Sequence, residues 1–353
     1  MSQYRVLVVT NLWPYDGDPS YGSFVQAQME SLRPLGVDYD LLFANGRLSR
    51  WNYFRAIAEL KRRLRSGTYD LIHAHMGLAG WIGRCQLSLP LVVSFLGNDI
   101  PGKVDRRGRT TFYGRCLELS SMVLARLAGA VIVKSQEMKR LLRLKSAYVI
   151  PNGVDLSRFR LMDRDAARRA LGLSLQNKFV LFPYRPEEPR KRYDLVQAVV
   201  ERARSSVPEL EILPVSRLPQ EQVATYMNAA DVMVMASMLE GSPNAVKEAL
   251  AVNLPLVTVE VGDTAELLEG TQGNFLVPRD VEIMAAKVIE ACQRGGRSSS
   301  RESITRRLSM EQIAAQVIQV YQAALAHSKK QSASNIRKGE PLPAGHPRHD
   351  GRP

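Results

Sequence analysis

Short apolar runs alternate with helix-like segments along most of the chain, and this alternation constrains the fold more than any other feature of the sequence. Between the first two runs, Val25, Met29 and Leu32 recur at helical spacing, and the pattern ends near Gly36. Each run is short and apolar throughout, which is typical of strands in a parallel sheet that is covered on both faces. In the first half of the chain these predicted strands are residues 6–10, 41–44, 71–74, 91–95, 130–133 and 147–150.

The alternation stops at residues 151–155, which read Pro-Asn-Gly-Val-Asp, a strong turn signal. It then starts again, with predicted strands at 179–182, 211–215, 232–235, 256–259 and 275–277 and helices near 194–204, 219–229, 243–251 and 280–293. Two successive series of this kind predict an α/β fold of two Rossmann-like, doubly wound domains that face each other. Because such sheets bind ligands at the carboxyl ends of their strands, we expect a shared cleft between the domains.

The predicted domain limits follow from this pattern. Residues 1–155 form the first domain and residues 156–309 the second. Residues 310–327 form a C-terminal helix that we expect to cross back to the first domain, with an apolar face made by Ile313, Val317, Val320 and Tyr321. Residues 328–353 are rich in Ser, Lys, Gly and Pro and contain few apolar residues, so we expect a disordered basic tail.

Several classes of protein are disfavoured by composition. No apolar run reaches the roughly 18 residues that a membrane-spanning helix needs. The sequence passes from Met1 directly into the first predicted strand without a basic, apolar leader, so we expect a cytoplasmic protein. Three widely spaced cysteines, Cys85, Cys116 and Cys292, fit neither a disulfide framework nor a zinc site, and we expect no bound metal.

Positive charge is concentrated in the first domain. Residues 1–155 carry 21 Lys and Arg against 12 Asp and Glu, whereas the whole chain has a net charge of +13. Such an excess favours an anionic partner, for example a membrane surface, a phosphorylated lipid or an acidic polysaccharide. The clusters at 61–65 and 103–109 are the parts that we expect to contact an anionic membrane.

The segment from 229 to 266 carries the clearest functional signal. A buried strand leads into Glu240-Gly241-Ser242-Pro243, where Ser242 can cap the following helix and Pro243 suits its first turn. The start of that helix presents free N–H groups and a partial positive charge to an anion. Glu240 precedes the helix and Glu248 lies inside its second turn, so one carboxylate can hold sugar hydroxyls and the other ribose hydroxyls. The pattern predicts a nucleotide-sugar site.

This segment resembles the E-x7-E signature of the retaining GT-B glycosyltransferases of family 4. Further blocks of the chain match the family in the same order along the sequence. Within the family, the sequence is most similar to that of a branch that includes enzymes making polysaccharides of the teichuronic acid type. The matching blocks are residues 10–14, 21–24, 69–75, 90–99, 149–155 and 262–266.

The resemblance implies a role for each matching residue. Glu240 would contact the donor sugar near the reacting carbon, and Glu248 would hold the ribose. The backbone of 241–244, which comprises Gly241, Ser242, Pro243 and Asn244, would bind the sugar and the diphosphate. Relatives neutralise the leaving diphosphate with an Arg and a Lys and need no metal or cofactor. Lys191 matches the Lys; Arg185 matches the Arg by spacing, with Arg190 as the alternative.

The first domain offers weaker candidates. Gly22 follows the first strand and opens a helix, so its loop either meets the donor diphosphate or is a plain turn. Asp99, next to Asn98 at a strand end, either binds the acceptor or caps a turn. We expect His73 and His75 to face opposite sides of one strand, with His75 toward the cleft and the acceptor. Relatives often have His where this chain has Leu96.

The function expected from these features is that of a retaining hexosyltransferase. It would move a sugar from a nucleotide donor, with UDP expected as the nucleotide, to a lipid-linked or polysaccharide acceptor. The acceptor hydroxyl would attack from the same face as the leaving phosphate, at the inner face of the cytoplasmic membrane. The alternatives are a sugar-nucleotide epimerase of the same fold and a basic scaffold that binds nucleic acid. The chain shows no nucleic-acid motif, so we do not expect the latter.

Overall fold

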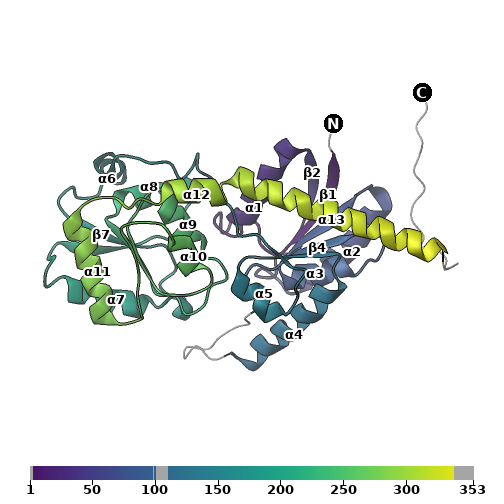
Figure 1. Cartoon of the computed structure of the whole chain (residues 1–353), viewed down its shortest axis with the longest axis horizontal. Helices are drawn as coiled ribbons and strands as arrows, with labels where there is room; N and C mark the ends of the chain where they lie inside the picture. Colours follow the sequence, from purple (N-terminus) through teal and green to yellow (C-terminus); the bar gives the residue numbers. More distant parts are fainter. Residues whose placement is uncertain (1–2, 98, 101–109, 338–353) are drawn as a thin grey trace.

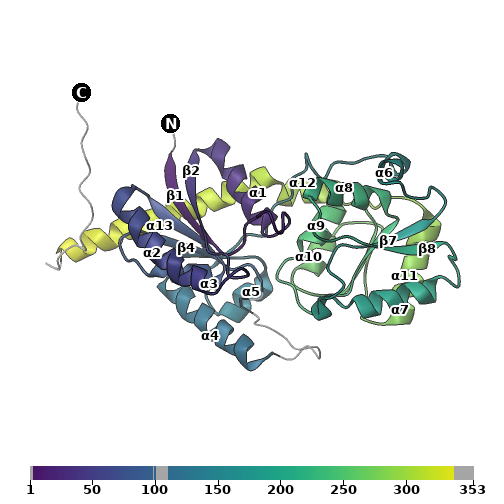
Figure 2. The same ribbon diagram turned by 180° about the vertical axis from the view of Figure 1, so that it is seen from behind.

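The chain folds into two α/β lobes that are joined at one side (Figure 1). The computed structural model describes residues 3–97, 99–100 and 110–337, with side chains described up to residue 330. Each lobe contains one parallel sheet with helices packed on both of its faces (Figures 1 and 2). The predicted pair of doubly wound domains is confirmed. Residues 101–109, which hold the predicted basic cluster at 103–109, lie outside the described part of the chain.

The first sheet has six strands in the order β2-β1-β3-β4-β5-β6. The strands are β1 Tyr4–Thr10, β2 Val37–Phe43, β3 Leu71–His75, β4 Leu91–Ser94, β5 Ala130–Val133 and β6 Tyr148–Val149. Its helices are α1 Ser23–Leu32, α2 Trp51–Ser66, α3 Gly77–Arg84, α4 Phe112–Leu127 and α5 Gln136–Leu142. Buried side chains such as Leu7, Ile72 and Val93 pack on one face of this sheet against α2, α3 and α4. These three helices therefore form one layer of the domain.

The second sheet has five strands in the order β11-β10-β9-β7-β8. The strands are β7 Lys178–Phe182, β8 Leu210–Pro214, β9 Val232–Met235, β10 Leu256–Thr258 and β11 Asn274–Leu276. Its helices are α6 Arg164–Leu171, α7 Tyr193–Ala203, α8 Gln220–Ala229, α9 Asn244–Ala251, α10 Thr264–Leu268, α11 Val281–Arg294 and α12 Arg301–Leu308. Asn253, with φ of 55°, follows α9 in the left-handed conformation that asparagine tolerates.

The last helix, α13 (Met310–Arg337), packs against α1, β4 and β5 of the first lobe, as the yellow helix in Figure 1 shows. Its buried residues are those on the predicted apolar face, including Val317 and Tyr321. The prediction that disorder begins at 328 is wrong, because the helix continues through 337. Residues 328–337 contain no Gly or Pro, and a polar helix can extend from an anchored one without a further core.

Among the helices of the described residues, none is both long enough and apolar enough to span a lipid bilayer.

Candidate active site

A cleft of about 640 Å³ lies between the two lobes. Its walls come from the loops that follow strands of both sheets, as expected for facing α/β domains. Nine of the residues singled out by the sequence line this cleft together: Gly22, Arg185, Lys191, Glu240, Gly241, Ser242, Pro243, Asn244 and Glu248. Leu96, where relatives often have His, also lines it.

A buried ion pair forms the centre of the second-domain wall. The Nζ of Lys191 contacts Oε1 of Glu240, and their side chains are 6% and 12% exposed. Lys191 lies at the end of a short 3-10 turn (Pro189–Lys191), with its Nζ 3.6 Å from the centre of the Tyr184 ring. Charges removed from water must be paired, and here each charge has its partner. The pair is therefore held in place before any ligand arrives.

The charges of this pair are set by competing effects. Burial alone would raise the pKa of Glu240, but Lys191 and Arg190 outweigh burial and lower this pKa. Burial lowers the pKa of Lys191, and the negative charge of Glu240 opposes that shift. The site therefore presents an ionised carboxylate beside a lysine whose positive charge depends on it.

The start of α9 faces the same cleft. Pro243 is its N-cap and no side chain caps the helix, so the predicted capping role of Ser242 is wrong. The Oγ of Ser242 donates instead to Oδ2 of Asp263 at 2.6 Å. Since Asp263 takes up this hydroxyl, the N–H groups of the first helical turn remain available to an anion.

Two contacts tie this helix start to the connection between the lobes. The Nδ2 of Asn152 donates to Oδ1 of Asn244 at 3.1 Å. The Nζ of the buried Lys247 donates to the backbone oxygen of Asn152 and to Oγ of Ser242, each at 3.1 Å. Burial lowers the pKa of Lys247 to about 8. The donor-side loop is thus fixed to the crossing segment and not only to its own domain.

Glu248 lies deeper in the cleft, in the second turn of α9. Burial raises its pKa to about 7, against the opposing effect of Lys247 and Arg158. Its carboxyl group is therefore poised to change charge near neutral pH, and a hydrogen-bond donor placed against it would favour the ionised form.

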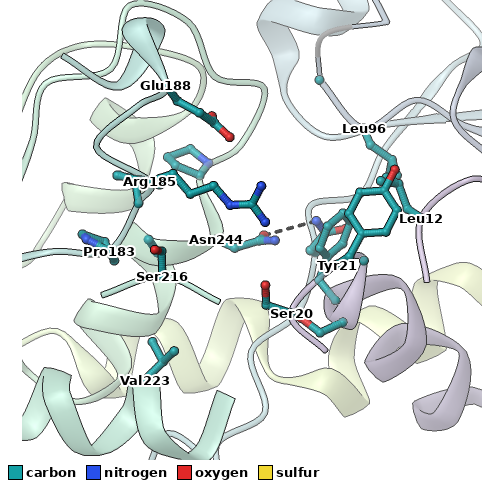
Figure 3. A pocket seen from close by; sticks show the side chains of 18 of the residues that line it. Leu12, Ser20, Tyr21, Leu96, Pro183, Arg185, Glu188, Ser216, Val223 and Asn244 are labelled. Atoms are coloured by element: carbon teal, nitrogen blue, oxygen red, sulfur yellow. Dashed lines mark hydrogen bonds between the residues drawn. The ribbon is translucent and has the colours of Figure 1, made fainter. Parts of the chain in front are cut away.

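The two candidate arginines are separated by the structure. Arg190 stays beside the ion pair, with its Nη1 3.5 Å from Oε1 of Glu240. Arg185 reaches across the cleft, where its Nη2 contacts Oδ2 of Asp18; Figure 3 shows it extending toward Ser20 and Tyr21. Both arginines line the cleft.

Asp18 on the first-domain side holds two cations at once. Besides Arg185, Nη1 of Arg47 lies 3.2 Å from Oδ2 of Asp18. Burial alone would raise the pKa of Asp18, but Ser20, Arg185 and Arg47 lower it. Asp18 is therefore an anion at the place where the cations of the cleft converge, and we call the pair Asp18–Arg185 the cross-cleft clasp.

Glycines bring backbones close together on both sides of the cleft. Gly22 has a φ of 70°, and a Cβ there would lie 2.3 Å from the carbonyl carbon of Leu12. A Cβ on Gly241 would lie 3.0 Å from Cα of Gly97 in the opposite lobe. Side chains at these positions would push the loop or the lobes apart.

The acceptor-side predictions are largely not supported by the geometry. Asp99 is buried and accepts from the backbone N–H groups of Leu96 (3.1 Å), Gly97 (2.9 Å) and Gly77 (3.2 Å), so it braces a turn outside the cleft lining. Asn98 lies outside the described residues. The sequence left the choice between acceptor binding and turn capping open, and the contacts of Asp99 are those of a turn cap.

The prediction for the two histidines is wrong. Residues two apart on a strand share a face, and the rings of His73 and His75 are 4.1 Å apart. Both are fully buried, and His75 does not line the cleft. His73 is hydrogen-bonded to the hydroxyl of Tyr321 on α13 at 2.7 Å, and burial lowers its pKa to about 3. These are neutral core histidines.

Four cleft-side residues escaped prediction: Asp18, Tyr184, Lys247 and Asp263. The sequence gives a signal for one of them, because Lys247 interrupts the apolar stripe of a short helix that is otherwise buried. The others depend on contacts between segments that are far apart in the sequence.

Comparison with known families matches both lobes of the chain. A family model described as Glycosyltransferase Family 4 matches residues 3–158. A second, described as Glycosyl transferases group 1, matches residues 178–294.

Individual relatives agree with these matches. A teichuronic acid biosynthesis glycosyltransferase of Bacillus subtilis (strain 168) is 24% identical over 347 residues, which cover 80% of this chain and 88% of the relative. The structure of a sucrose-phosphate synthase from Thermosynechococcus elongatus superposes with a TM-score of 0.73 at 20% identity, over 91% of this chain and 99% of that one. A structure of Anabaena HepE in complex with UDP-glucose superposes with a TM-score of 0.64 at 17% identity, over 93% and 100% of the two chains.

Proposed function

The chain is a glycosyltransferase of the two-domain GT-B type, built from a family 4 and a group 1 domain, and from this premise we propose that it transfers a hexosyl unit from a UDP-sugar with retention of configuration. The observation that carries the proposal is the buried Lys191–Glu240 pair beside the uncapped start of α9, in a cleft between the lobes. A cation, a carboxylate and free amides in one hollow are the groups that a sugar diphosphate requires.

Each part of the donor has a counterpart in the cleft. The diphosphate would lie against the amides at the start of α9 and against Lys191, with Arg185 or Arg190 as a second cation. Glu240 would accept from the sugar hydroxyls and Glu248 from those of the ribose. These side chains supply positive charge without a metal or a cofactor, so we propose that the reaction uses neither.

The transfer step breaks the bond between the anomeric carbon and the phosphate oxygen and forms a bond from that carbon to the acceptor oxygen on the same face. The acceptor proton passes to the departing phosphate, and UDP leaves. Negative charge grows on the diphosphate as the bond breaks, and Lys191 stabilises it in a site where water is largely replaced by fixed charges. No covalent intermediate with the protein is part of this proposal.

For the acceptor we propose a lipid-linked or polysaccharide chain, used at the inner face of the cytoplasmic membrane. The name of the Bacillus relative places that protein in polysaccharide biosynthesis, and the excess of cations in residues 1–155 suits an anionic acceptor or surface. No nucleic acid is part of the proposed activity.

A panel of nucleotide sugars tests the donor. We expect UDP and one UDP-sugar to raise the melting temperature, and Glu248→Ala to abolish this shift; Glu266→Ala, which removes an acid outside the cleft lining, should leave it unchanged. The anomeric configuration of the product, read by NMR, tests retention. An inverted product, or conversion of the donor sugar into its epimer without transfer, would overturn the proposal.

The same residue predicts a pH dependence. Glu248, with a pKa of about 7, accepts more strongly from ribose hydroxyls when it is ionised, so UDP-sugar affinity should fall as the pH drops through that value. Calorimetric titration at several pH values measures this, and the trend should be absent in Glu248→Gln. An affinity that is independent of pH in the wild type would contradict this role.

The cross-cleft clasp gives a separate expectation. Asp18 competes with a bound diphosphate for Arg185, so Asp18→Asn should tighten UDP binding by about 3- to 10-fold. Asp16→Asn removes an equal charge from the same loop at an exposed position and serves as the matched control. Weaker UDP binding in Asp18→Asn would show that Asp18 helps to build the site instead of competing for its cation.

A further inference from the structure

Large apolar side chains are exposed at high density on one layer of the first lobe. Of the sixteen that are exposed in the described part of the chain, ten lie between residues 48 and 127. They belong to α2, α3, α4 and the adjoining loops, which pack side by side on one face of the first sheet. Single exposed apolar residues are ordinary on protein surfaces, whereas a gathering of this kind marks a contact surface.

Helix α4 carries the most regular part of this surface. Phe112, Cys116, Leu119, Val123 and Leu127 recur every three or four residues and are all exposed, so they form one stripe along the helix. Phe112 is 84% exposed and Leu119 is 63% exposed. The opposite face of the helix is buried in the domain. Within the part of the chain that the structure describes, folding thus covers one face of α4 and leaves its apolar stripe exposed.

Helix α2, which packs against α3 as α4 does, adds aromatic and basic groups to the same layer. Trp51 and Phe54, both exposed, have ring centres 5.6 Å apart in the first turn. Farther along the same outward side, α2 exposes Lys61, Arg62 and Arg65. Its acid Glu59 is bonded to Arg62 and to Arg63, which leaves a surplus of positive charge.

Cations also flank the stripe of α4. Arg115 and Arg126 are exposed beside it, and Glu118 is the one acidic residue in that helix. Aromatic and aliphatic side chains bordered by Lys and Arg are typical of a helix that lies in the interfacial region of an anionic bilayer.

We propose that the outward stripe of α4 and the first turn of α2, together called the α2–α4 surface, insert shallowly into an anionic lipid bilayer. This inference rests on the proposed function and names the partner of its acceptor side. The charge distribution favours lipid over a second copy of the chain. A two-fold contact would bring the cations of both copies into one interface, where they repel, whereas anionic headgroups complement them.

The position of the surface relative to the cleft fits this partner. Arg47 and Met76 line the cleft, and two further exposed apolar residues of the same helical layer, Leu48 just before α2 and Leu78 in α3, follow them within two residues. Helix α2 starts four residues after Arg47 and α3 starts directly after Met76, so these two helices lead away from the first-domain wall of the cleft. A lipid-linked acceptor could present its head to the cleft while its chains stay in the bilayer.

Vesicle flotation tests the inserted side chains. We expect the full chain to bind vesicles of phosphatidylcholine with phosphatidylglycerol and to remain partly bound in high salt, since buried apolar contacts are not screened. Leu119→Asp with Val123→Asp should reduce binding by about 10-fold or more. Leu161→Asp, at an exposed apolar position in the second domain, is the control and should bind like the wild type.

A fluorescent probe reports insertion directly. With Cys85→Ser, the exposed Cys116 is left to label, because Cys292 is buried. An environment-sensitive dye on Cys116 should shift to the blue when these vesicles are added. UDP-induced thermal stabilisation, measured in the same samples, should persist in the Leu119→Asp, Val123→Asp variant, which separates this proposal from the proposed catalytic function.

Three outcomes would overturn the inference. The first is unchanged vesicle binding in the Leu119→Asp, Val123→Asp variant. The second is complete loss of binding in high salt without any shift of the Cys116 dye, which would show a purely electrostatic contact. The third is a wild-type protein that does not bind vesicles and is a dimer without lipid, whereas the Leu119→Asp, Val123→Asp variant is a monomer. The α2–α4 surface would then be a self-association interface.

Discussion

Lys191→Met should lower kcat/KM for the UDP-sugar by about 10²- to 10³-fold, the largest loss that we expect from a single substitution in the cleft. Methionine preserves the length and the apolar stem of the side chain, so the change removes the charge and little else. Lys191 is the cation already desolvated beside Glu240, and a diphosphate that gains charge as it leaves depends on such a group. Steady-state kinetics with the active donor measure the effect.

The control is Lys287→Met, which makes the same change on the surface of α11, where Lys287 pairs with Glu290. It should leave kcat/KM within about 2-fold of the wild type, because an exposed pair contributes little. If Lys191→Met changed KM alone, with kcat intact, the lysine would serve ground-state binding, and the assignment to the leaving group would fail.

Glu240→Gln should lower the free energy of unfolding by about 3 kcal/mol and kcat by about 10²-fold, since the variant leaves Lys191 buried without its counter-charge. The two effects should depend on pH with opposite signs. Burial already lowers the pKa of Lys191, and loss of the Glu240 charge lowers it further. The folded variant then binds fewer protons than the unfolded chain, so its stability should recover as pH rises. Its activity should fall over the same range, because the lysine becomes neutral.

Denaturation and rate profiles over pH measure both trends. Glu290→Gln, on exposed α11, is the matched control for stability. A cycle with Lys191→Met provides a further check, because two members of one buried pair should show strong non-additivity. If the losses of stability and of kcat in Glu240→Gln did not change with pH, the role of Glu240 would not depend on the charge of Lys191.

The second-domain half of the site was predictable because its parts lie within one stretch of chain. Glu240, Gly241 and Glu248 belong to a single strand–loop–helix unit, whose local geometry brings them to one wall. Lys191 comes from the loop that follows the neighbouring strand β7, and parallel strands deliver their carboxyl-end loops to the same edge. Periodicity and turn chemistry predict the strand–loop–helix unit, whereas Lys191 was assigned through the family resemblance.

The errors arose where distant contacts decide. Ser242 has the sequence of a helix cap, yet Asp263, 21 residues away, takes its hydroxyl. The error for His73 and His75 was partly local, because residues two apart on a strand share a face; that α13 covers this face of the first sheet and hydrogen-bonds His73 is the distant part. Arg185 lines the cleft as predicted, but its partner Asp18, from the opposite lobe and 167 residues earlier, was not foreseen. No local pattern encodes such partners.

The chain passes between the lobes twice, and the two passages touch. The backbone N–H of Val154 donates to the oxygen of Leu308 at 2.8 Å, and Val154 forms a parallel bridge with Ser309. A single tether would let one lobe swivel in any direction over the other. Two connections that lie side by side resist twisting, so the favoured motion is a hinge rotation of one lobe relative to the other about the line through the two connections. Asn152, two residues from this line, also holds Lys247 and Asn244. A rotation of one lobe relative to the other therefore also moves the donor-side loop at the start of α9.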